Sequence, residues 1–166
     1  IPIIAANLQK LMLPAQSQIW AVLRAGDSLR RINYSMVNGF LGVLCLSGDV
    51  YDLSDAQWKQ AEEGISFYKE IRPIVQRGVS YFYGERSESM RHPEGWQAVC
   101  RRGENGETLV TVHTFGGELP ERVTLPVEAL EIRRVLCTEG NEVTLENGKL
   151  TVELRANFEA VAVHLA

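Results

Sequence analysis

Apolar runs and helical patterns alternate along the first half of the chain. Two runs have the length of a strand and are apolar almost throughout, "QIWAVLR" (residues 18–24) and "FLGVLCL" (residues 40–46). The segments around them place apolar residues at helical spacing, over residues 5–13, over residues 27–39 and from Ser54 onward. Such strands, separated by amphipathic helices, are typical of a parallel sheet covered by helices. Because two strands do not make a stable sheet alone, we expect them to be the closing units of a larger one.

Two of the predicted helices carry recognisable ends. Asp27 or Ser28 is the expected N-cap of the second helix. Ser54, with Gln57 three residues later, forms a capping box that starts the third helix. Proline has no backbone N–H to donate, so Pro73 is expected to end that helix.

The pattern changes near Gly78 to short strands divided by turn residues. The pair Asn147-Gly148 lies between two alternating runs and is the strongest hairpin signal in the chain. This spacing predicts an antiparallel sandwich of roughly 85 residues, which begins between Ile74 and Gly84. The predicted strands cover residues 95–102, 108–116, 122–126, 131–137, 142–146, 149–154 and 158–166.

A carboxylate follows directly after the second apolar run. Ser47, Gly48 and Asp49 stand where a parallel strand would leave its sheet. In (β/α) barrels, catalytic and substrate-binding groups lie at the carboxyl ends of the strands. Gly48 would let the backbone turn sharply, and Asp49 would point into the mouth of such a barrel. The alternative is that Asp49 only satisfies backbone amides in the turn.

The first apolar run offers further candidates for a binding site. Gln18 and Trp20 are two residues apart and therefore share one face of the strand. Near a barrel mouth a tryptophan often stacks on the apolar face of a sugar, and the alternative for Trp20 is a place in the core. Arg24, at the carboxyl end, would reach a ligand hydroxyl or form an ion pair with Asp27.

The most polar stretch of the chain is "GERSESMRHPEGW", residues 84–96, which contains Arg86, Glu88, Arg91 and His92. It is either a ligand-binding loop or a connection between domains whose charges pair across the interface.

Composition narrows the range of partners. Seventeen basic residues against 21 acidic ones give a net charge of −4, which argues against nucleic acid as the partner. No apolar run approaches the roughly 20 residues that span a bilayer, so we expect no membrane association. The three cysteines, Cys45, Cys100 and Cys137, have neither disulfide nor zinc spacing and suit a reducing, cytoplasmic compartment. The histidines are scattered, and we expect no metal and no other cofactor.

Several stretches together resemble a known family. They are "IPIIAANLQKLMLPAQSQIWAVLR", "SLRRINYSMVNGFLGVLCLSGDVYDLSDAQW", and "RSESMRHPEGWQAV" followed by "LVTVHTF". In combination they are similar to the C-terminal part of bacterial α-galactosidases, nearest to glycoside hydrolase family 36. The resemblance implies a mixed fold: residues 1–74 would be the last βα units of an incomplete (β/α)8 barrel, and residues 75–166 a C-terminal antiparallel β-sandwich.

The resemblance also implies what this chain lacks. Retaining glycosidases of this kind use two carboxyl groups about 5–5.5 Å apart, and in this family both would precede the segment that matches Ile1. The parent would release terminal α-linked galactose, whereas this chain would hold no catalytic residue and would be inactive alone. Its contacts with an α-galactoside or related sugar would come from Asp49 and Trp20, then Gln18. We expect it to be part of a longer protein, since it begins with isoleucine and no signal-peptide pattern follows.

Two alternatives from other classes stay open. A carbohydrate-binding sandwich would need an exposed row of aromatic residues, yet Trp96, Phe115 and Phe158 are each expected to face the core. The aromatic run at residues 81–83 keeps that alternative open. A structural, homo-oligomer-forming domain is the other alternative, because parallel strands without neighbours leave unpaired edges.

Overall fold

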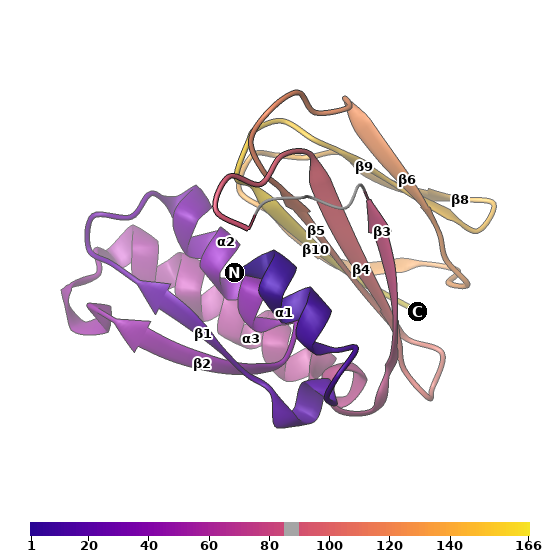
Figure 1. Ribbon diagram of the computed structural model, residues 1–166, viewed down its shortest axis with the longest axis horizontal. Coiled ribbons are helices and arrows are strands. Elements are labelled where there is room, and N and C mark those ends of the chain that lie inside the picture. The colour runs from indigo at the N-terminus through magenta and orange to yellow at the C-terminus, as the bar shows by residue number, and fades with distance from the viewer. Residues whose placement is uncertain (85–89) are drawn as a thin grey trace.

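The computed structural model describes residues 1–84 and 90–166, with a helical part first in the chain and an antiparallel part after it (Figure 1). The helices are α1 (Pro2–Leu8), α2 (Leu29–Gly39) and α3 (Asp55–Arg77), with 3-10 turns at Pro14–Gln16 and Val50–Asp52. The strands are β1 (Gln18–Leu23), β2 (Val43–Gly48), β3 (Val79–Gly84), β4 (Trp96–Arg102), β5 (Thr108–Thr114), β6 (Arg122–Pro126), β7 (Ile132–Leu136), β8 (Val143–Glu146), β9 (Lys149–Glu153) and β10 (Ala160–Leu165). No described helix is long and apolar enough to cross a membrane.

Strands β1 and β2 pair in parallel, with Leu23 opposite Gly48. Alternate residues of β1 are buried, and Ala21 and Leu23 contribute to a core shared with α2 and α3. On the other face of β1, Gln18 and Trp20 are exposed and Val22 is half-buried, and β2 is half-buried along its whole length. The second strand begins at Val43 rather than at Phe40, because Phe40 serves as the C-cap of α2.

The remaining strands form two antiparallel sheets, as expected of a β-sandwich. One has the order β3-β4-β5-β10-β7 and the other the order β6-β9-β8. A cluster of buried valine, leucine and alanine side chains from both sheets fills the space between them. The hairpin between β8 and β9 turns through Asn147 and Gly148, both with positive φ (50° and 71°), as predicted. Strand β3 was not predicted, because its run of aromatic residues lacks the alternation of the other strands.

The five-stranded sheet is covered on both faces. Along β10, Ala160 and Ala162 belong to the helical core, whereas Val161 and Val163 belong to the core of the sandwich. The small residues therefore face α2, which packs against β10, and the larger ones face the second sheet.

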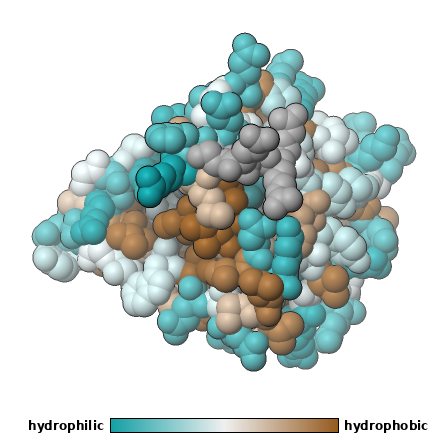
Figure 2. Space-filling view, in the orientation of Figure 1, coloured by the Kyte–Doolittle hydropathy of each residue, from teal (hydrophilic) through white to brown (hydrophobic). Residues whose placement is uncertain are grey.

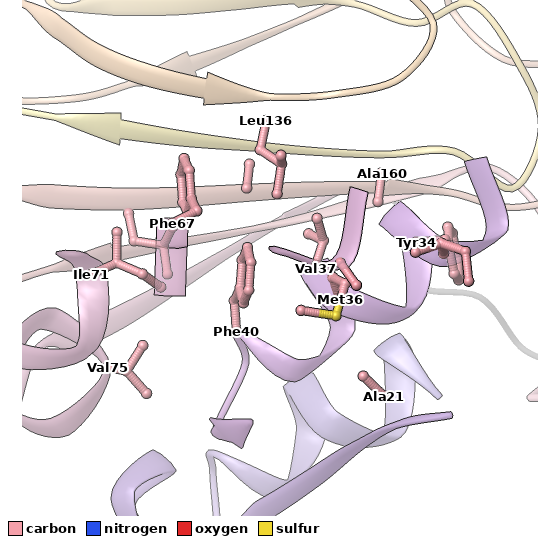
Figure 3. Packing of buried hydrophobic residues seen from close by; sticks show 14 of the residues in the cluster. Ala21, Tyr34, Met36, Val37, Phe40, Phe67, Ile71, Val75, Leu136 and Ala160 are labelled. Atoms are coloured by element: carbon pink, nitrogen blue, oxygen red, sulfur yellow. The ribbon is translucent and has the colours of Figure 1, made fainter. Parts of the chain in front are cut away.

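The helical core connects both parts of the chain (Figure 3). Phe40 stacks on Phe67 with ring centroids 5.4 Å apart, and Leu136 and Ala160 of the sandwich belong to the same cluster. The secondary structure changes from helix to antiparallel strand between Arg77 and β3, and this core crosses the change. The division into domains at residues 74 and 75 stays a prediction.

The predicted starts of α2 and α3 are confirmed, whereas the bounds of α1 and the end of α3 are wrong. The first helix was expected over residues 5–13 but covers Pro2–Leu8, because proline is accommodated in the first turn of a helix, where its missing N–H has no intrahelical acceptor. Ser28 accepts a hydrogen bond from the Arg31 amide, and Ser54 with Gln57 makes both bonds of a capping box. Helix α3, however, continues through Pro73 to Arg77. Its last turns bury apolar side chains (Ile71, Ile74 and Val75) in the helical core, and this burial offsets the hydrogen bond that Pro73 cannot make.

Candidate functional site

The parallel register of β1 and β2 brings two charged residues together at their carboxyl ends. Gly48, opposite Leu23, has a φ of +101°, which L-residues rarely adopt. The next amide, that of Asp49, donates to the Leu23 carbonyl oxygen at 2.8 Å. This turn places Asp49 beside Arg24, the residue that follows β1.

Asp49 forms an ion pair at this edge of the sheet. Its Oδ1 accepts a hydrogen bond from Arg24 Nη1 at 3.1 Å, and both side chains remain open to solvent (39% and 59% exposed). The Asp49 side chain makes no capping hydrogen bond to the 3-10 turn that follows, so the turn-capping alternative is not supported. The expected partner of Arg24, Asp27, instead accepts from the Arg24 backbone amide at 2.9 Å.

Gln57 holds the loop between β1 and α2, a role that the sequence did not indicate. Gln57 is buried, and its Nε2 donates to the carbonyl oxygens of Asp27 at 2.6 Å and Ala25 at 3.0 Å. Gln57 also completes the capping box of α3. One side chain therefore joins the start of α3 to the backbone that positions Arg24. The sequence contained the capping-box pattern of Ser54 and Gln57. It could not show that Gln57 also binds the backbone of the loop about 30 residues earlier, because such a contact leaves no local pattern.

The two other predicted site residues lie apart from Asp49. Gln18 and Trp20 share the exposed face of β1, and Trp20 is 53% exposed, so it is not a core residue of this chain. Gln18 is paired with Val43 at the opposite end of the sheet from Asp49. Leu23 lies five residues after Gln18 along the strand, which corresponds to roughly 16 Å. Asp49 and Gln18 therefore cannot bind the same small group.

Trp20 instead borders a pocket of about 160 Å³ between α1, α2 and the sandwich. The pocket mixes aromatic and polar groups: Tyr34, Phe115 and Phe158 line it together with Arg31, Ser35 and Asn38. Apolar residues of α1 surround this region and form the brown area in the middle of the face drawn in Figure 2.

Phe158 departs from its prediction. It was expected in the core, but it is 50% exposed. Phe158 has a φ of +55° and lies in the turn before β10, which begins at Ala160, so it is not part of the inward and outward alternation of that strand. Phe115 is buried and Trp96 packs against the sandwich core, as expected.

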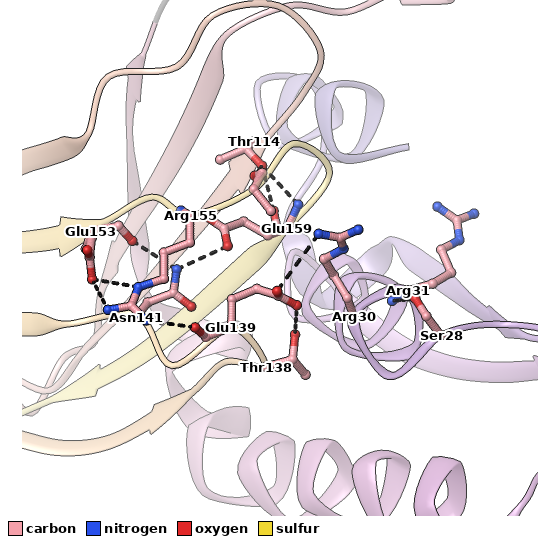
Figure 4. A network of polar contacts seen from close by, with 11 residues as sticks. Ser28, Arg30, Arg31, Thr114, Thr138, Glu139, Asn141, Glu153, Arg155 and Glu159 are labelled. Carbon is pink, nitrogen blue, oxygen red and sulfur yellow. Dashed lines mark hydrogen bonds and ion pairs between the residues drawn. The ribbon is translucent and has the colours of Figure 1, made fainter.

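Beside this turn, a buried carboxylate organises the loops that precede β10 (Figure 4). Glu159 is 1% exposed, and its carboxylate accepts hydrogen bonds from the Arg155 amide at 2.7 Å and from Asn141 Nδ2 at 3.1 Å. The Thr114 hydroxyl group accepts from the Glu159 amide at 2.9 Å. These contacts connect the β7–β8 connection, the β9–β10 connection and the end of β5, and we assign them a structural role.

The histidines and acids offer no metal site in the described part of the chain, where no group of three or more His, Cys, Asp or Glu side chains could hold an ion. His113 is fully buried against the edge of Tyr34, with ring centroids 5.4 Å apart. Burial lowers the pKa of His113 to about 3, so the ring is neutral at physiological pH. The polar stretch at residues 84–96 lies partly outside the described residues, which leave out Arg86 and Glu88.

No protein-family model and no curated protein sequence matches this chain. Solved structures of α-galactosidases do share its fold. The galactosidase domain of the α-galactosidase–sucrose kinase AgaSK superposes with a TM-score of 0.64 at 14% identity, covering 99% of this chain and 24% of that one. A variant of the family 36 α-galactosidase AgaA of Geobacillus stearothermophilus, in complex with 1-deoxygalactonojirimycin, gives a TM-score of 0.64 at 16% identity and covers 99% of this chain and 24% of that one.

A variant of AgaA in complex with raffinose gives a TM-score of 0.61 at 18% identity, and covers 100% of this chain and 24% of the enzyme. The chain therefore spans about a quarter of the length of these enzymes. The resemblance to family 36 α-galactosidases is confirmed at the level of the fold over nearly the whole chain, consistent with a C-terminal fragment.

Proposed function

We propose that this chain is the C-terminal part of an α-galactosidase-like retaining glycoside hydrolase, whose parent releases terminal α-linked galactose. The observation that carries the proposal is the shared fold, which extends through both the βα units and the sandwich of this chain. Most of the parent's length would then lie outside the sequence described here.

The β1–β2 sheet supports the assignment of residues 1–74 to the end of a (β/α)8 barrel. Its strands are parallel, one face packs on helices, and the other face of β1 is exposed at Gln18 and Trp20. In a closed barrel that second face would point inward, and further strands would cover it.

Asp49 is the residue of this chain that we assign to the sugar site. It stands at the carboxyl end of a barrel strand, with its carboxylate open to solvent and oriented by Arg24. A carboxylate in that position accepts hydrogen bonds from sugar hydroxyl groups. Trp20 would stack on a sugar ring, and Gln18, at the other end of β1, is the weakest of the three candidates.

The isolated chain should not catalyse hydrolysis. A retaining mechanism needs an ionised nucleophile and a second carboxyl group that is kept protonated, typically by burial. Asp27 and Asp49 both contact Arg24, and neither is buried. They therefore lack the contrast in environment that separates an acid from a nucleophile.

The proposal is tested by kinetics of the parent enzyme on p-nitrophenyl α-galactoside, with Asp49→Asn compared with Asp52→Asn. Losing one charged hydrogen bond to the sugar should lower kcat/KM about 10- to 100-fold. Asp52 is an exposed residue of the same loop and serves as the matched control, expected to stay within about twofold. No hydrolysis by the unchanged parent would overturn the proposed activity, whereas equal rates for both variants would overturn only the role of Asp49.

A non-catalytic carbohydrate-binding module remains the second candidate, because Tyr81 and Phe82 of edge strand β3 are 50% and 40% exposed. Neighbouring residues of a strand point to opposite faces, so these two rings do not form one platform. A titration of the chain with galactose, followed by NMR, separates the two candidates. Shifts confined to β3 would favour the binding module.

A further inference from the structure

One arginine of the sandwich is buried where the sandwich meets the helices. Arg101 of β4 is 1% exposed and is among the largest fully buried side chains. Burial lowers the pKa of Arg101 to about 10, so its guanidinium is still charged at neutral pH. Gly78, between α3 and β3, makes room for its stem, since a Cβ at Gly78 would lie 2.7 Å from Arg101 Cγ.

Among the described residues, the hydrogen-bond partners of this charge are neutral and come from three segments of the chain. Arg101 Nη2 donates to Gln9 Oε1 at 2.7 Å and to the Leu41 carbonyl oxygen at 3.0 Å. Nη1 donates to the Phe40 carbonyl oxygen at 3.3 Å, and Nε donates to Ser80 Oγ at 2.9 Å. Across the described residues, no carboxylate forms an ion pair with Arg101.

Two of these acceptors are the carbonyl groups of the α2 C-cap, Phe40, and of the residue after it, Leu41. The chain leaves the helix through short i+3 turns, in which the amides of Phe40, Leu41 and Gly42 donate to carbonyl groups three residues back. The carbonyl groups at a helix C-terminus lack intrahelical partners and carry partial negative charge. Arg101 supplies both the donors and the positive charge, so a residue of the sandwich completes the C-terminal end of α2.

The same carbonyl groups stand directly before strand β2. Gly42 follows them, and a Cβ there would lie 2.4 Å from the Ser17 carbonyl oxygen. The Val43 amide donates to that same oxygen at 2.7 Å and thereby starts the pairing of β2 with β1. The path of the chain at residues 40–42 therefore sets the register that ends at Gly48 and Asp49.

We propose that Arg101 is a positioning residue through which the sandwich holds the end of α2 and the start of β2. The proposal concerns the fold and does not depend on the activity of a parent enzyme. Tyr68 of α3 also holds this turn, since its hydroxyl group donates to the Gly42 carbonyl oxygen and accepts from the Leu44 amide. Arg101 and Tyr68 together restrict residues 40–44.

Two opposing effects decide what Arg101→Met should do. Removing a buried charge also removes the free-energy cost of taking that charge out of water. For this reason, replacing a whole buried ion pair by apolar residues is often neutral or stabilising. Here, however, the acceptors remain after the substitution, and the carbonyl oxygens of Phe40 and Leu41 lose the donors recorded for them. Buried acceptors left without donors destabilise a protein. We therefore expect this cost to exceed the free energy gained by removing the buried charge, so that Arg101→Met is destabilising.

Hydrogen exchange of the full chain tests the proposal, with Arg101→Met compared with Arg102→Met. Arg102 is the exposed neighbour on the same strand and pairs with Glu128 at the surface. In Arg101→Met, amides of residues 40–49 should exchange at least about tenfold faster, while those of β8 and β9 stay unchanged. The Arg102→Met variant should match the unchanged chain throughout.

Faster exchange confined to β4 and its sheet neighbours, with residues 40–49 unchanged, would overturn the proposal. If Arg101→Met does not fold, Gln9→Ala removes a single acceptor of the guanidinium and leaves the two carbonyl bonds. This milder variant should keep residues 40–49 protected but raise exchange in α1. An equal rise in residues 40–49 would also contradict the assignment, because it would place their support in α1.

Discussion

At Gly48 the backbone takes a φ of +101°, and a Cβ there would lie 2.0 Å from the Leu23 carbonyl oxygen. Both conditions require glycine, the first for the conformation and the second for the close approach of β1. This residue therefore sets the turn that brings Asp49 to Arg24.

Gly48→Ala should destabilise the chain by at least about 2 kcal/mol, because strain in a rarely populated backbone region adds to the clash with Leu23. The measurement is the free energy of unfolding in urea. Gly26→Ala is the matched control, since nothing lies within 4 Å of a Cβ there and its φ is not positive, and it should change stability by less than about 0.5 kcal/mol. Equal values for the two variants would contradict this account of the turn.

His113 makes stability depend on pH in a defined direction. Its pKa falls from 6.5 to about 3 on folding because burial disfavours the charged ring. The group therefore contributes its full stability above pH 6.5, and this contribution is lost as the pH falls toward 3.

Between pH 7.5 and pH 5.0, this loss should amount to about 2 kcal/mol, and it should be absent in His113→Phe. Phenylalanine keeps an aromatic ring against Tyr34 but cannot titrate. The measurement is the free energy of unfolding of both proteins at both pH values. If both lose the same amount, or if NMR shows the His113 ring charged at pH 5.0, the prediction fails.

At the end of the parallel strands, the sequence predicted local features but not the contact between the strands. The sharp turn at Gly48 and the position of Asp49 at the end of the strand could be predicted, because a glycine and an acid directly after an apolar run form a local signal. The pairing of Arg24 with Asp49 could not, since it depends on the register between two strands. Asp27 looked like the nearer partner, but its carboxylate binds the backbone amide of Arg24 instead.

At the scale of elements, helix α3 shows how packing overrides a local signal. Pro73 lies at an exposed position near the end of this helix, and neighbouring residues of the same turns are buried in the helical core. The starts of α2 and α3 were easier to predict than this end, because their capping residues act within four residues of the chain, whereas α1 has no side-chain cap and its start was missed. Strand β3 was missed because its aromatic run lacks a polar and apolar alternation, and only its pairing with β4 identifies it as a strand.

Pro73→Ala should stabilise the chain by about 1–3 kcal/mol, because it restores a helical N–H and removes the clash of the ring with the preceding turn. The greater freedom of alanine in the unfolded chain reduces this gain by about 0.5 kcal/mol. Urea unfolding of Pro73→Ala is compared with Glu62→Ala, an exposed position in the same helix that should have little effect. A destabilised Pro73→Ala variant would mean that the proline ring itself contributes to the packing.

For the whole molecule, one sheet serves two cores. Its outer face receives α2 and α3, and its inner face receives the three-stranded sheet. The order of helices before strands was predictable from periodicity alone. The shared core was not predictable. Along β10, Ala160 and Ala162 alternate with larger residues, but the sequence does not show that the helices pack on one face of this strand and the second sheet on the other.

The central claim is that this fold is the end of a larger glycosidase. It is tested most directly by reading the coding DNA upstream of the Ile1 codon. A typical (β/α)8 barrel takes about 250 residues, so we predict an open reading frame that continues for several hundred codons and encodes aspartates at the carboxyl ends of two strands. A start codon immediately before Ile1 would contradict the claim and leave this chain as a small binding or structural protein.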